Sequence, residues 1–216
     1  MVTGLAAEAR IAGALWPDVA AGGGTEAGAR RAAEQLVESG AEALLSFGLA
    51  GGLDPALRPG DLVAPLAVLH QGETLPTDAE LRRQLRGTPI DLLLGETRIL
   101  ADAAEKRRVW RQTRAGAVDL ESGAVAVVAQ RHRLPWAVLR AICDPAERSL
   151  PPAAVAALDA GGAIRGWRVL SSVLRQPRQI PALLALGHDA AAARRALLRC
   201  VSDAPSPLLP AVRGSN

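Results

Sequence analysis

Hydrophobic residues along the chain fall into short unbroken runs, separated by longer stretches in which apolar and polar positions recur with helical spacing. The unbroken runs at residues 43–47, 61–69 and 136–142 are typical of strands covered on both faces. Shorter segments predict strands at residues 2–5, 18–21 and 116–118. Helical spacing predicts helices at residues 6–15, 26–39, 78–86, 101–114 and 121–133. Because strands and helices alternate, we expect a three-layer α/β domain with a largely parallel central sheet.

Capping and turn residues mark the ends of some of these elements. Thr25 is the expected N-cap of the helix at residues 26–39, and Gly40 is its expected C′ residue. The glycine-dense stretch from Gly48 to Pro55 predicts a turn in which the backbone can approach a ligand closely.

Beyond Leu150 the pattern is helical throughout. Helices are predicted at residues 153–158, 167–174 and 180–201. Residues 202–216 are rich in proline, serine and glycine, which predicts a flexible tail. We therefore expect one α/β domain over residues 1–201, of which residues 150–201 form a helical end.

The composition fits a single domain with an aliphatic core. A chain of 216 residues is within reach of one α/β domain. Hydrophobic residues make up 49% of the chain but aromatic residues only 2%, so Ala, Val, Leu and Ile must build the core. Such small side chains favour helices packed closely on a sheet.

Charge, cysteine and histidine content argue against several kinds of partner. The formal net charge is +3, but the arginines are scattered among acidic residues and few aromatics are available to stack on bases, so we expect no nucleic-acid partner. No apolar run approaches the ~20 residues of a membrane span. Cys143 and Cys200 lie far apart with no signal peptide ahead of them, which favours a cytoplasmic protein. His70, His132 and His188 are isolated, so we expect no metal and no cofactor, with phosphate as a candidate co-substrate.

Acidic side chains follow three of the predicted strands: Glu8, Asp119, Glu121 and Asp144. Ligands of parallel α/β sheets collect at the carboxyl ends of the strands, so these side chains could converge on one site. Each acid also has a simpler interpretation. Glu8 could complement a helix N-terminus, Glu121 could be a first-turn acid after an Asp119 N-cap, and Asp144 could initiate a turn.

The segments around these acids resemble those of nucleoside phosphorylases and of methylthioadenosine/S-adenosylhomocysteine nucleosidases. Residues 46–63, SFGLAGGLDPALRPGDLV, are similar to the glycine-rich segment of that superfamily. Residues 117–126, AVDLESGAVA, are similar to its ribose-binding segment, and residues 139–144, LRAICD, to its base-binding segment. With the spacing of Gly4 and Glu8, the matches follow the superfamily's order from residue 2 to about residue 146. On the basis of these motifs, the chain is identified as a member of that superfamily.

Within the superfamily the chain is most similar to the hopanoid-associated phosphorylases, also called adenosylhopane nucleosidases. The similarity rests on TGLAAEARIA near the N-terminus, on the glycine-rich segment, on the step Leu150-Pro151-Pro152 and on the Arg-, Pro- and Leu-rich end. It implies a nucleoside phosphorylase-like fold, release of adenine from adenosylhopane in hopanoid biosynthesis, and a homodimer. A methylthioadenosine or S-adenosylhomocysteine nucleosidase is the alternative, and a catalytically silent nucleoside- or lipid-binding protein is a third.

The resemblance also implies roles for the acids. Asp144, which follows Cys143 in the base-binding segment, matches the acid that protonates the purine leaving group. Glu121 matches the glutamate that binds the ribose hydroxyls, in a segment shared with Asp119 and Leu120. Its charge helps to stabilise an oxocarbenium-like transition state.

The attacking group, water or phosphate, is expected at a loop formed by Gly48, Leu49, Ala50 and Gly51. Glu8 lies near the position of the glutamate that activates water in nucleosidases. Phosphorylases instead place a phosphate-binding arginine near this turn, and Arg10 and Arg30 are the candidates. Because a carboxylate at the nucleophile site repels phosphate, we favour hydrolysis over phosphorolysis.

Two further features bear on the substrate. No aromatic residue lies between Gly95 and Lys106, where nucleosidases stack the adenine. The C-terminal helices carry apolar residues interleaved with arginines: Trp167, Leu170, Val173, Leu174, Ile180, Leu183, Leu184 and Leu186, with Arg168, Arg175 and Arg178. These residues either cap the sheet as core or form a lipid-facing surface that contacts the inner membrane.

Overall fold

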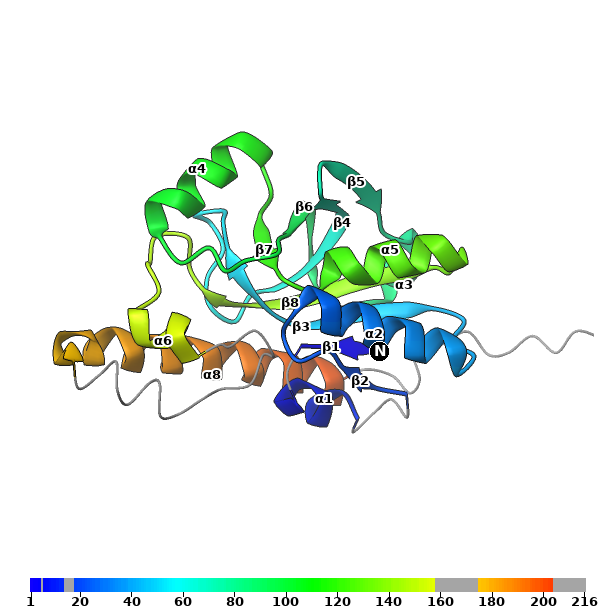
Figure 1. Ribbon diagram of the computed structural model, residues 1–216, viewed down its shortest axis with the longest axis horizontal. Helices are drawn as coiled ribbons and strands as arrows, with labels where there is room; N and C mark the ends of the chain where they lie inside the picture. The colour runs from blue at the N-terminus through cyan, green and yellow to red at the C-terminus, as the bar shows by residue number, and fades with distance from the viewer. Residues whose placement is uncertain (5, 14–17, 158–174, 204–216) are drawn as a thin grey trace, which may run out of the picture.

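A mixed β-sheet lies at the centre of the computed structural model, which describes residues 1–4, 6–13, 18–157 and 175–203 (Figure 1). Its eight strands are β1 (Val2–Thr3), β2 (Ala20–Ala21), β3 (Leu44–Gly52), β4 (Leu62–His70), β5 (Glu73–Pro76), β6 (Thr88–Gly95), β7 (Ala117–Asp119) and β8 (Trp136–Asp144). The order along the sheet is β2-β1-β3-β7-β6-β4-β5, and β8 pairs with both β3 and β4.

Five of these strands form a closed ring. β3 pairs with β7, β7 with β6, β6 with β4, β4 with β8, and β8 again with β3. The pairs β1–β2, β1–β3, β3–β8, β4–β6 and β6–β7 are parallel, whereas β3–β7, β4–β5 and β4–β8 are antiparallel. The prediction of an α/β fold with a largely parallel sheet is confirmed, and the antiparallel pairs that close the ring are an addition to it.

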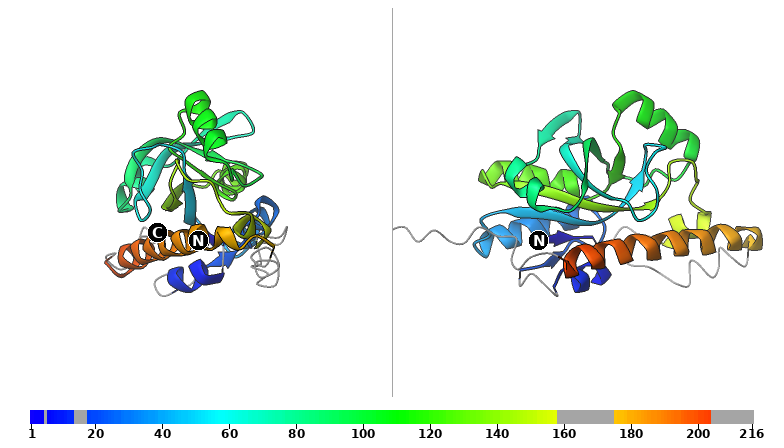
Figure 2. Two further views of the ribbon diagram at one scale, coloured as in Figure 1. Left: turned by 90° about the vertical axis from the view of Figure 1, so that its left-hand side faces the viewer. Right: turned by 180° about the vertical axis from the view of Figure 1, so that it is seen from behind.

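Helices cover two sides of the paired strands β3 and β8. The described helices are α1 (Ala6–Ala12), α2 (Glu26–Glu38), α3 (Ala79–Gln84), α4 (Ala103–Thr113), α5 (Ser122–His132), α6 (Pro152–Ala157), the short 3-10 turn η1 (Pro177–Gln179) and α8 (Ile180–Ser202). Side chains of α2 and α5 join one core cluster with Leu44 and Val138, while those of α1 and α8 join another with Phe47 and Leu139. Figure 2 shows α8 running along one side of the sheet, as this division requires.

The core is built from small aliphatic side chains, as the composition predicts. Ala29, Ala32 and Ala33 of α2 are buried in the first cluster together with Ala126 and Ala129 of α5. A Cβ added at Gly28 would lie 1.6 Å from the carbonyl oxygen of Gly22, so the first turn of α2 touches the backbone of the preceding loop. A core of small side chains with few aromatics therefore lets α2 pack closely against α5 and against the backbone of the preceding loop.

The predicted caps of α2 are confirmed. The hydroxyl of Thr25 accepts a hydrogen bond of 3.1 Å from the backbone N–H of Gly28. Gly40 follows the C-cap with a φ of +90°, the left-handed conformation that favours glycine at this position.

Two strands and one turn differ from the sequence prediction. β5 and β6 lie in a stretch where no strand was predicted, because its polar residues hide the pattern and only the last three residues of β6 are buried. The prediction of a turn beginning at Gly48 is wrong, since β3 continues to Gly52 with a register shift between Ala50 and Gly51. Glycine here makes room for neighbouring side chains within a strand and does not reverse the chain.

The predicted helical end is confirmed in part. α6 and α8 lie where helices were expected at residues 153–158 and 180–201. The helix predicted at residues 167–174, with Trp167, Arg168, Leu170, Val173 and Leu174, lies outside the described residues, and so do residues 204–216 of the predicted tail. In the part of the chain that the structure describes, no helix is both long and apolar enough to cross a membrane.

Candidate active site

A cavity of about 340 Å³ lies at the carboxyl ends of β3, β7 and β8. Nine of the residues expected at the site line it: Glu8, Leu49, Ala50, Gly51, Asp119, Leu120, Glu121, Cys143 and Asp144. The structure thus brings acids from three separate segments of the chain to the wall of one cavity. Two of the segments follow β1 and β8, which run parallel to β3, and the third follows β7, which runs antiparallel to β3.

The remaining wall of the cavity is largely apolar. It is formed by Ile99, Leu100, Val118, Leu150, Ala154, Leu186 and Ala190, together with Gly24 and Arg98. Ile99 and Leu100 come from the segment in which a stacking aromatic was expected and found missing. Leu186 shows that α8 contributes to the wall, whereas Ile180 and Leu184 of the same helix are 43% and 70% exposed.

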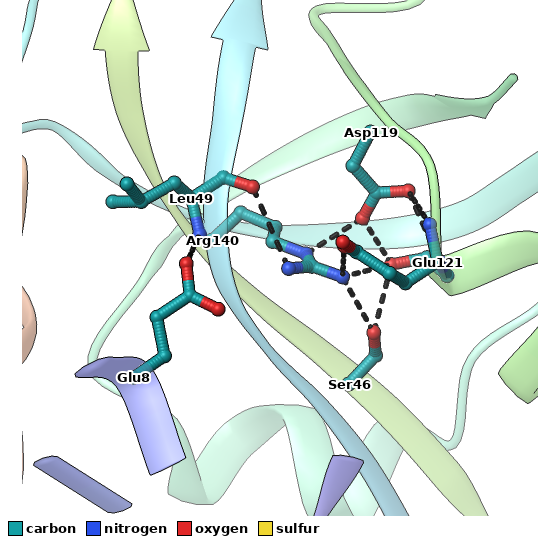
Figure 3. Close-up of polar contacts among 7 residues, drawn as sticks. Glu8, Ser46, Leu49, Asp119, Glu121 and Arg140 are labelled. Atoms are coloured by element: carbon teal, nitrogen blue, oxygen red, sulfur yellow. Dashed lines mark hydrogen bonds and ion pairs between the residues drawn. The ribbon is translucent and has the colours of Figure 1, made fainter. Parts of the chain in front are cut away.

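A buried arginine, Arg140 of β8, organises the acids that follow β7 (Figure 3). Its Nε lies 2.6 Å from Oδ2 of Asp119, and its Nη2 lies 2.9 Å from Oε2 of Glu121. Nη2 also donates to the hydroxyl of Ser46 at 2.8 Å and to that of Ser122 at 3.3 Å. Because a buried guanidinium needs charged partners to offset its desolvation, this network fixes both carboxylates in place.

Asp119 positions the start of α5 as well. Its Oδ1 accepts hydrogen bonds from the backbone N–H groups of Glu121 and Ser122, at 3.3 Å and 3.0 Å. Asp119 thus binds backbone N–H groups at the start of α5, but the N-cap position itself is occupied by Glu121. Glu121, however, turns its carboxylate to Arg140 and to the cavity, and is more than a first-turn acid.

Burial raises the pKa of Glu121 from its ordinary value of 4.5 to about 7. Arg140 opposes this rise, while the negative charges of Asp119 and Glu8 add to it. Near neutral pH the residue thus exchanges a proton within the range in which an enzyme works.

Glu8 reaches the cavity from α1 and is 3% exposed. Its Oε1 accepts a hydrogen bond of 3.2 Å from the backbone N–H of Leu49 (Figure 3). A Cβ at Gly48 would lie 2.8 Å from Oε2 of Glu8 and 2.7 Å from Nη1 of Arg140. Gly48 does not line the cavity itself, but its missing side chain is what lets Glu8 and Arg140 approach the strand.

Asp144, at the end of β8, forms a buried ion pair with Lys106 of α4. Its Oδ1 accepts a hydrogen bond of 3.3 Å from the thiol of Cys143. Burial, followed by the charge of Asp144, raises the pKa of the Cys143 thiol well above its ordinary range, so this cysteine remains a neutral thiol.

The structure does not place Arg10 at the site. Arg10 is exposed on α1, and it is not among the residues that line the cavity. It follows Glu8 by two positions on a helix, where such neighbours point in different directions, so only one of them faces the cavity. Arg10 thus lies outside the cavity wall, and its role as a phosphate anchor stays a prediction.

Sequence reasoning gave no role to Arg140, Ser46 or Lys106. Arg140 stands inside the base-binding motif, and an arginine in an otherwise apolar strand is a signal that a carboxylate must meet it. Lys106 is the only lysine of the chain. Its partner lies 38 residues away in the sequence, so the pairing is visible only in three dimensions.

No group of three or more His, Cys, Asp or Glu side chains that could hold a metal ion occurs among the described residues. The expectation of a site without a metal or cofactor stays a prediction.

Comparison with known families decides the classification of the chain. The family described as the phosphorylase superfamily matches residues 19–92 and 91–163, which include β3 and the segments that carry Glu121 and Asp144. The chain belongs to the phosphorylase superfamily. This confirms the predicted superfamily and supports an N-glycosyl hydrolase or a nucleoside phosphorylase as the class of enzyme.

Solved structures show the same fold over nearly the whole chain. A Helicobacter pylori methylthioadenosine nucleosidase mutant with 5′-methylthioadenosine in the active site has a TM-score of 0.65 and 15% identity, covering 94% of this chain and 96% of that one. The Neisseria meningitidis 5′-methylthioadenosine/S-adenosylhomocysteine nucleosidase with methylthio-immucillin-A has a TM-score of 0.66 and 15% identity, covering 93% and 95%. The native futalosine hydrolase of Helicobacter pylori has a TM-score of 0.65 and 15% identity, covering 94% and 95%. A comparison with curated protein sequences gave no significant match.

Proposed function

We propose that this member of the phosphorylase superfamily hydrolyses the N-glycosidic bond of a purine nucleoside. The observation that carries the proposal is that Glu8, Glu121 and Asp144 line one cavity of about 340 Å³. Cleavage of this bond requires a protonated leaving group, stabilised positive charge on the ribose ring and a nucleophile delivered to C1′. The three carboxyl groups supply one group for each requirement.

In the proposed reaction, Asp144 first takes up a proton from solvent on Oδ1, the oxygen that Lys106 does not bind. It gives this proton to N7 of the purine as the bond from C1′ to N9 breaks and its electron pair passes to the base. Glu121 accepts hydrogen bonds from the ribose hydroxyls, and its charge stabilises the oxocarbenium-like transition state. Glu8 takes a proton from water while the water oxygen bonds to C1′. Asp144 is left as a carboxylate and Glu8 as a carboxylic acid, and exchange with solvent restores both.

The charges around the cavity favour water over phosphate as the attacking group. Arg140 is already paired with Asp119 and Glu121, and Lys106 is paired with Asp144. Arg98, the cation in the cavity wall, is paired with Glu105. Glu8 adds a further carboxylate, which is bonded to the backbone of Leu49 in β3. A phosphate dianion would meet more negative than positive charge at this place.

Of the two substrates expected from the sequence, a 5′-substituted soluble adenosine such as 5′-methylthioadenosine or S-adenosylhomocysteine is now better supported than adenosylhopane. Two of the similar structures are of enzymes named for these compounds, and one was solved with 5′-methylthioadenosine in its active site. Leu150, Ala154, Leu186 and Ala190 form an apolar wall against which a thioether or hydrocarbon substituent would pack. Preference for adenosylhopane, contact of the C-terminal helices with a membrane surface, and a homodimer stay predictions.

The test is to incubate the protein with 5′-methylthioadenosine, S-adenosylhomocysteine and adenosylhopane, and to compare kcat/KM for adenine release. We expect release of adenine, with the soluble compounds as the better substrates. In water enriched in heavy oxygen, hydrolysis places the label on the sugar product, which mass spectrometry detects. Absence of base release from every purine nucleoside would show that the proposed function is wrong, and a marked preference for the lipid would restore the adenosylhopane assignment.

A further inference from the structure

Lys106 is the only lysine of the chain, and it is fully buried in α4. An ammonium group in the protein interior loses its hydration, and this loss is offset only when charged and hydrogen-bonding partners surround the group. Every other basic residue of the chain is an arginine. The chain therefore has its one lysine ammonium at a position where burial of the charge is costly.

The three donor positions of this ammonium all have partners. Nζ of Lys106 donates to Oδ2 of Asp144 and, at 3.2 Å each, to the carbonyl oxygens of Pro145 and Arg148. The carboxylate is its charged partner, and the two carbonyls fix its position relative to the loop that follows β8. Lys106 itself does not line the cavity, whereas Asp144 does.

The pair leaves the other oxygen of Asp144 turned toward the cavity side. Oδ1 lies 3.3 Å from the thiol of Cys143 and 3.2 Å from the point where a Cβ on Gly51 would stand. Cys143 and Gly51 both line the cavity. Lys106 thus binds Asp144 through Oδ2, and Oδ1 lies beside two residues of the cavity wall without a bond to the ammonium.

The beginning of α4 is tied to the same loop. The hydroxyl of Ser149 accepts a hydrogen bond of 3.0 Å from the backbone N–H of Ala103, and Leu150 donates from its N–H to the carbonyl of Ala101 at 2.8 Å. The side chain of Asp102 caps the first turn of the helix. These bonds prevent Lys106 from moving away from Asp144 without breaking the contact between helix and loop.

We propose that Lys106 is a positioning residue for departure of the base, an inference that rests on the proposed function. As Asp144 passes its proton to N7 of the purine, negative charge grows on the carboxyl group. The ammonium stabilises that charge in a buried site, where electrostatic effects are stronger than in water, and so stabilises the transition state. Lys106 acts entirely through Asp144 and touches no substrate.

A series of 5′-methylthioribosides tests the proposal, with leaving groups that range from adenine to 4-nitrophenol. Adenine must be protonated to leave, but 4-nitrophenolate leaves without an acid. Lys106→Met should lower kcat for the adenine compound by about tenfold or more and for the nitrophenyl compound by less than about threefold. Asp144→Asn should show the same pattern with a loss on the order of a hundredfold for adenine.

The matched control is Arg107→Met, which removes the same charge from the adjacent, exposed position of α4 and should leave the whole series unchanged. Each variant is assayed below its own Tm, and Lys106→Gln, which keeps a donor for the carbonyls but no charge, gives the same comparison if Lys106→Met does not fold. Equal losses for all leaving groups would mean that Lys106 only supports the structure, and would overturn the inference. A wild-type protein inactive on the entire series would instead contradict the proposed function.

Discussion

Arg140 sets the electrostatic character of the site without lining the cavity. Its guanidinium meets Asp119 at 2.6 Å and Glu121 at 2.9 Å, and all three side chains are buried. One positive charge therefore faces two carboxylates, with Glu8 adding to the negative charge felt by Glu121. Burial, with the charges of Asp119 and Glu8 adding to it, is why the pKa of Glu121 rises to about 7 despite an arginine in contact with it.

The raised pKa of Glu121 predicts how stability depends on pH. Between its ordinary value of 4.5 and about 7, the folded protein holds a proton at Glu121 that the unfolded chain has lost. The contribution of Glu121 to the free energy of unfolding is therefore fully present below about pH 4.5 and is lost as the pH rises through about 7. Denaturant unfolding of the wild type and of Glu121→Gln, at about pH 5 and pH 8, measures this contribution. The wild type should lose more stability between the two pH values than the variant does.

Glu73→Gln provides the control for this comparison, because Glu73 is exposed on the edge strand β5. Its pH dependence should match that of the wild type. If Glu121→Gln also matches the wild type at both pH values, then Glu121 does not carry the raised pKa and Arg140 keeps it ionised.

At the scale of elements, the alternation of predicted strands and helices was the feature of the sequence that best predicted where the site lies. The acids after β7 and β8 were expected together because ligands gather where parallel strands end. The acids do meet, but β7 runs antiparallel to β3 and β8 runs parallel to it, so the two segments reach the site from opposite directions. The length of β3 could not be predicted from the sequence, since glycines such as Gly48 and Gly51 are typical of turns. They stand in a strand because Glu8, Arg140 and Asp144 occupy the space that their side chains would fill. Such a reason lies in three-dimensional neighbours and leaves no local pattern.

The pair between Lys106 and Asp144 was hidden for a similar reason. The amphipathic pattern predicts that α4 is a helix, but a lysine in it looks like any solvated residue. Only the bonds between the start of α4 and the loop after β8 show why this lysine is buried. β6 escaped prediction because Pro89 and Asp91 interrupt its first half and only its last three residues are buried, so the apolar run is too short to recognise.

Gly48→Ala tests the role of this strand glycine. The new Cβ would stand 2.8 Å from Oε2 of Glu8 and 2.7 Å from Nη1 of Arg140, so at least one of these side-chain ends must move. Because displacement of a catalytic group by about 1 Å can cost on the order of a hundredfold in rate, we expect kcat to fall by about tenfold or more. Residue 48 also has a φ of +153°, which residues other than glycine rarely adopt, so the variant should lose some stability. The fold should survive because both contacts are with side-chain ends, and circular dichroism with a thermal melt checks this.

Gly187→Ala is the matched control for that substitution. Gly187 is exposed in α8, and a Cβ there would meet nothing within 4 Å. The variant should keep full activity and gain up to about 1 kcal/mol of stability from better helix propensity. A Gly48→Ala enzyme with unchanged kcat would show that the position of Glu8 is not decisive.

At the scale of the whole molecule, the cavity depends on both ends of the chain. Glu8 comes from α1 near the N-terminus, and Leu186 and Ala190 come from α8, the last described helix. α1 and α8 also share a core cluster beneath β3 and β8. The closed ring of five strands holds the other acids above this layer, so the site is complete only when the entire domain has folded.

The charge balance of the assembled site predicts that water, not phosphate, attacks C1′. Glu8 is the residue that separates the two reactions, because a carboxylate can take a proton from water but repels phosphate. Adenine release by the wild type should be the same in phosphate-free buffer and in buffer with phosphate. Glu8→Gln should lower kcat on the order of a hundredfold in both buffers, since the amide cannot accept the proton. Arg10→Ala, on the exposed side of the same helix, is the control and should change neither kcat nor any effect of phosphate. Saturable dependence of the wild type on phosphate, together with normal activity of Glu8→Gln, would show that the enzyme is a phosphorylase and that Glu8 has only a structural role.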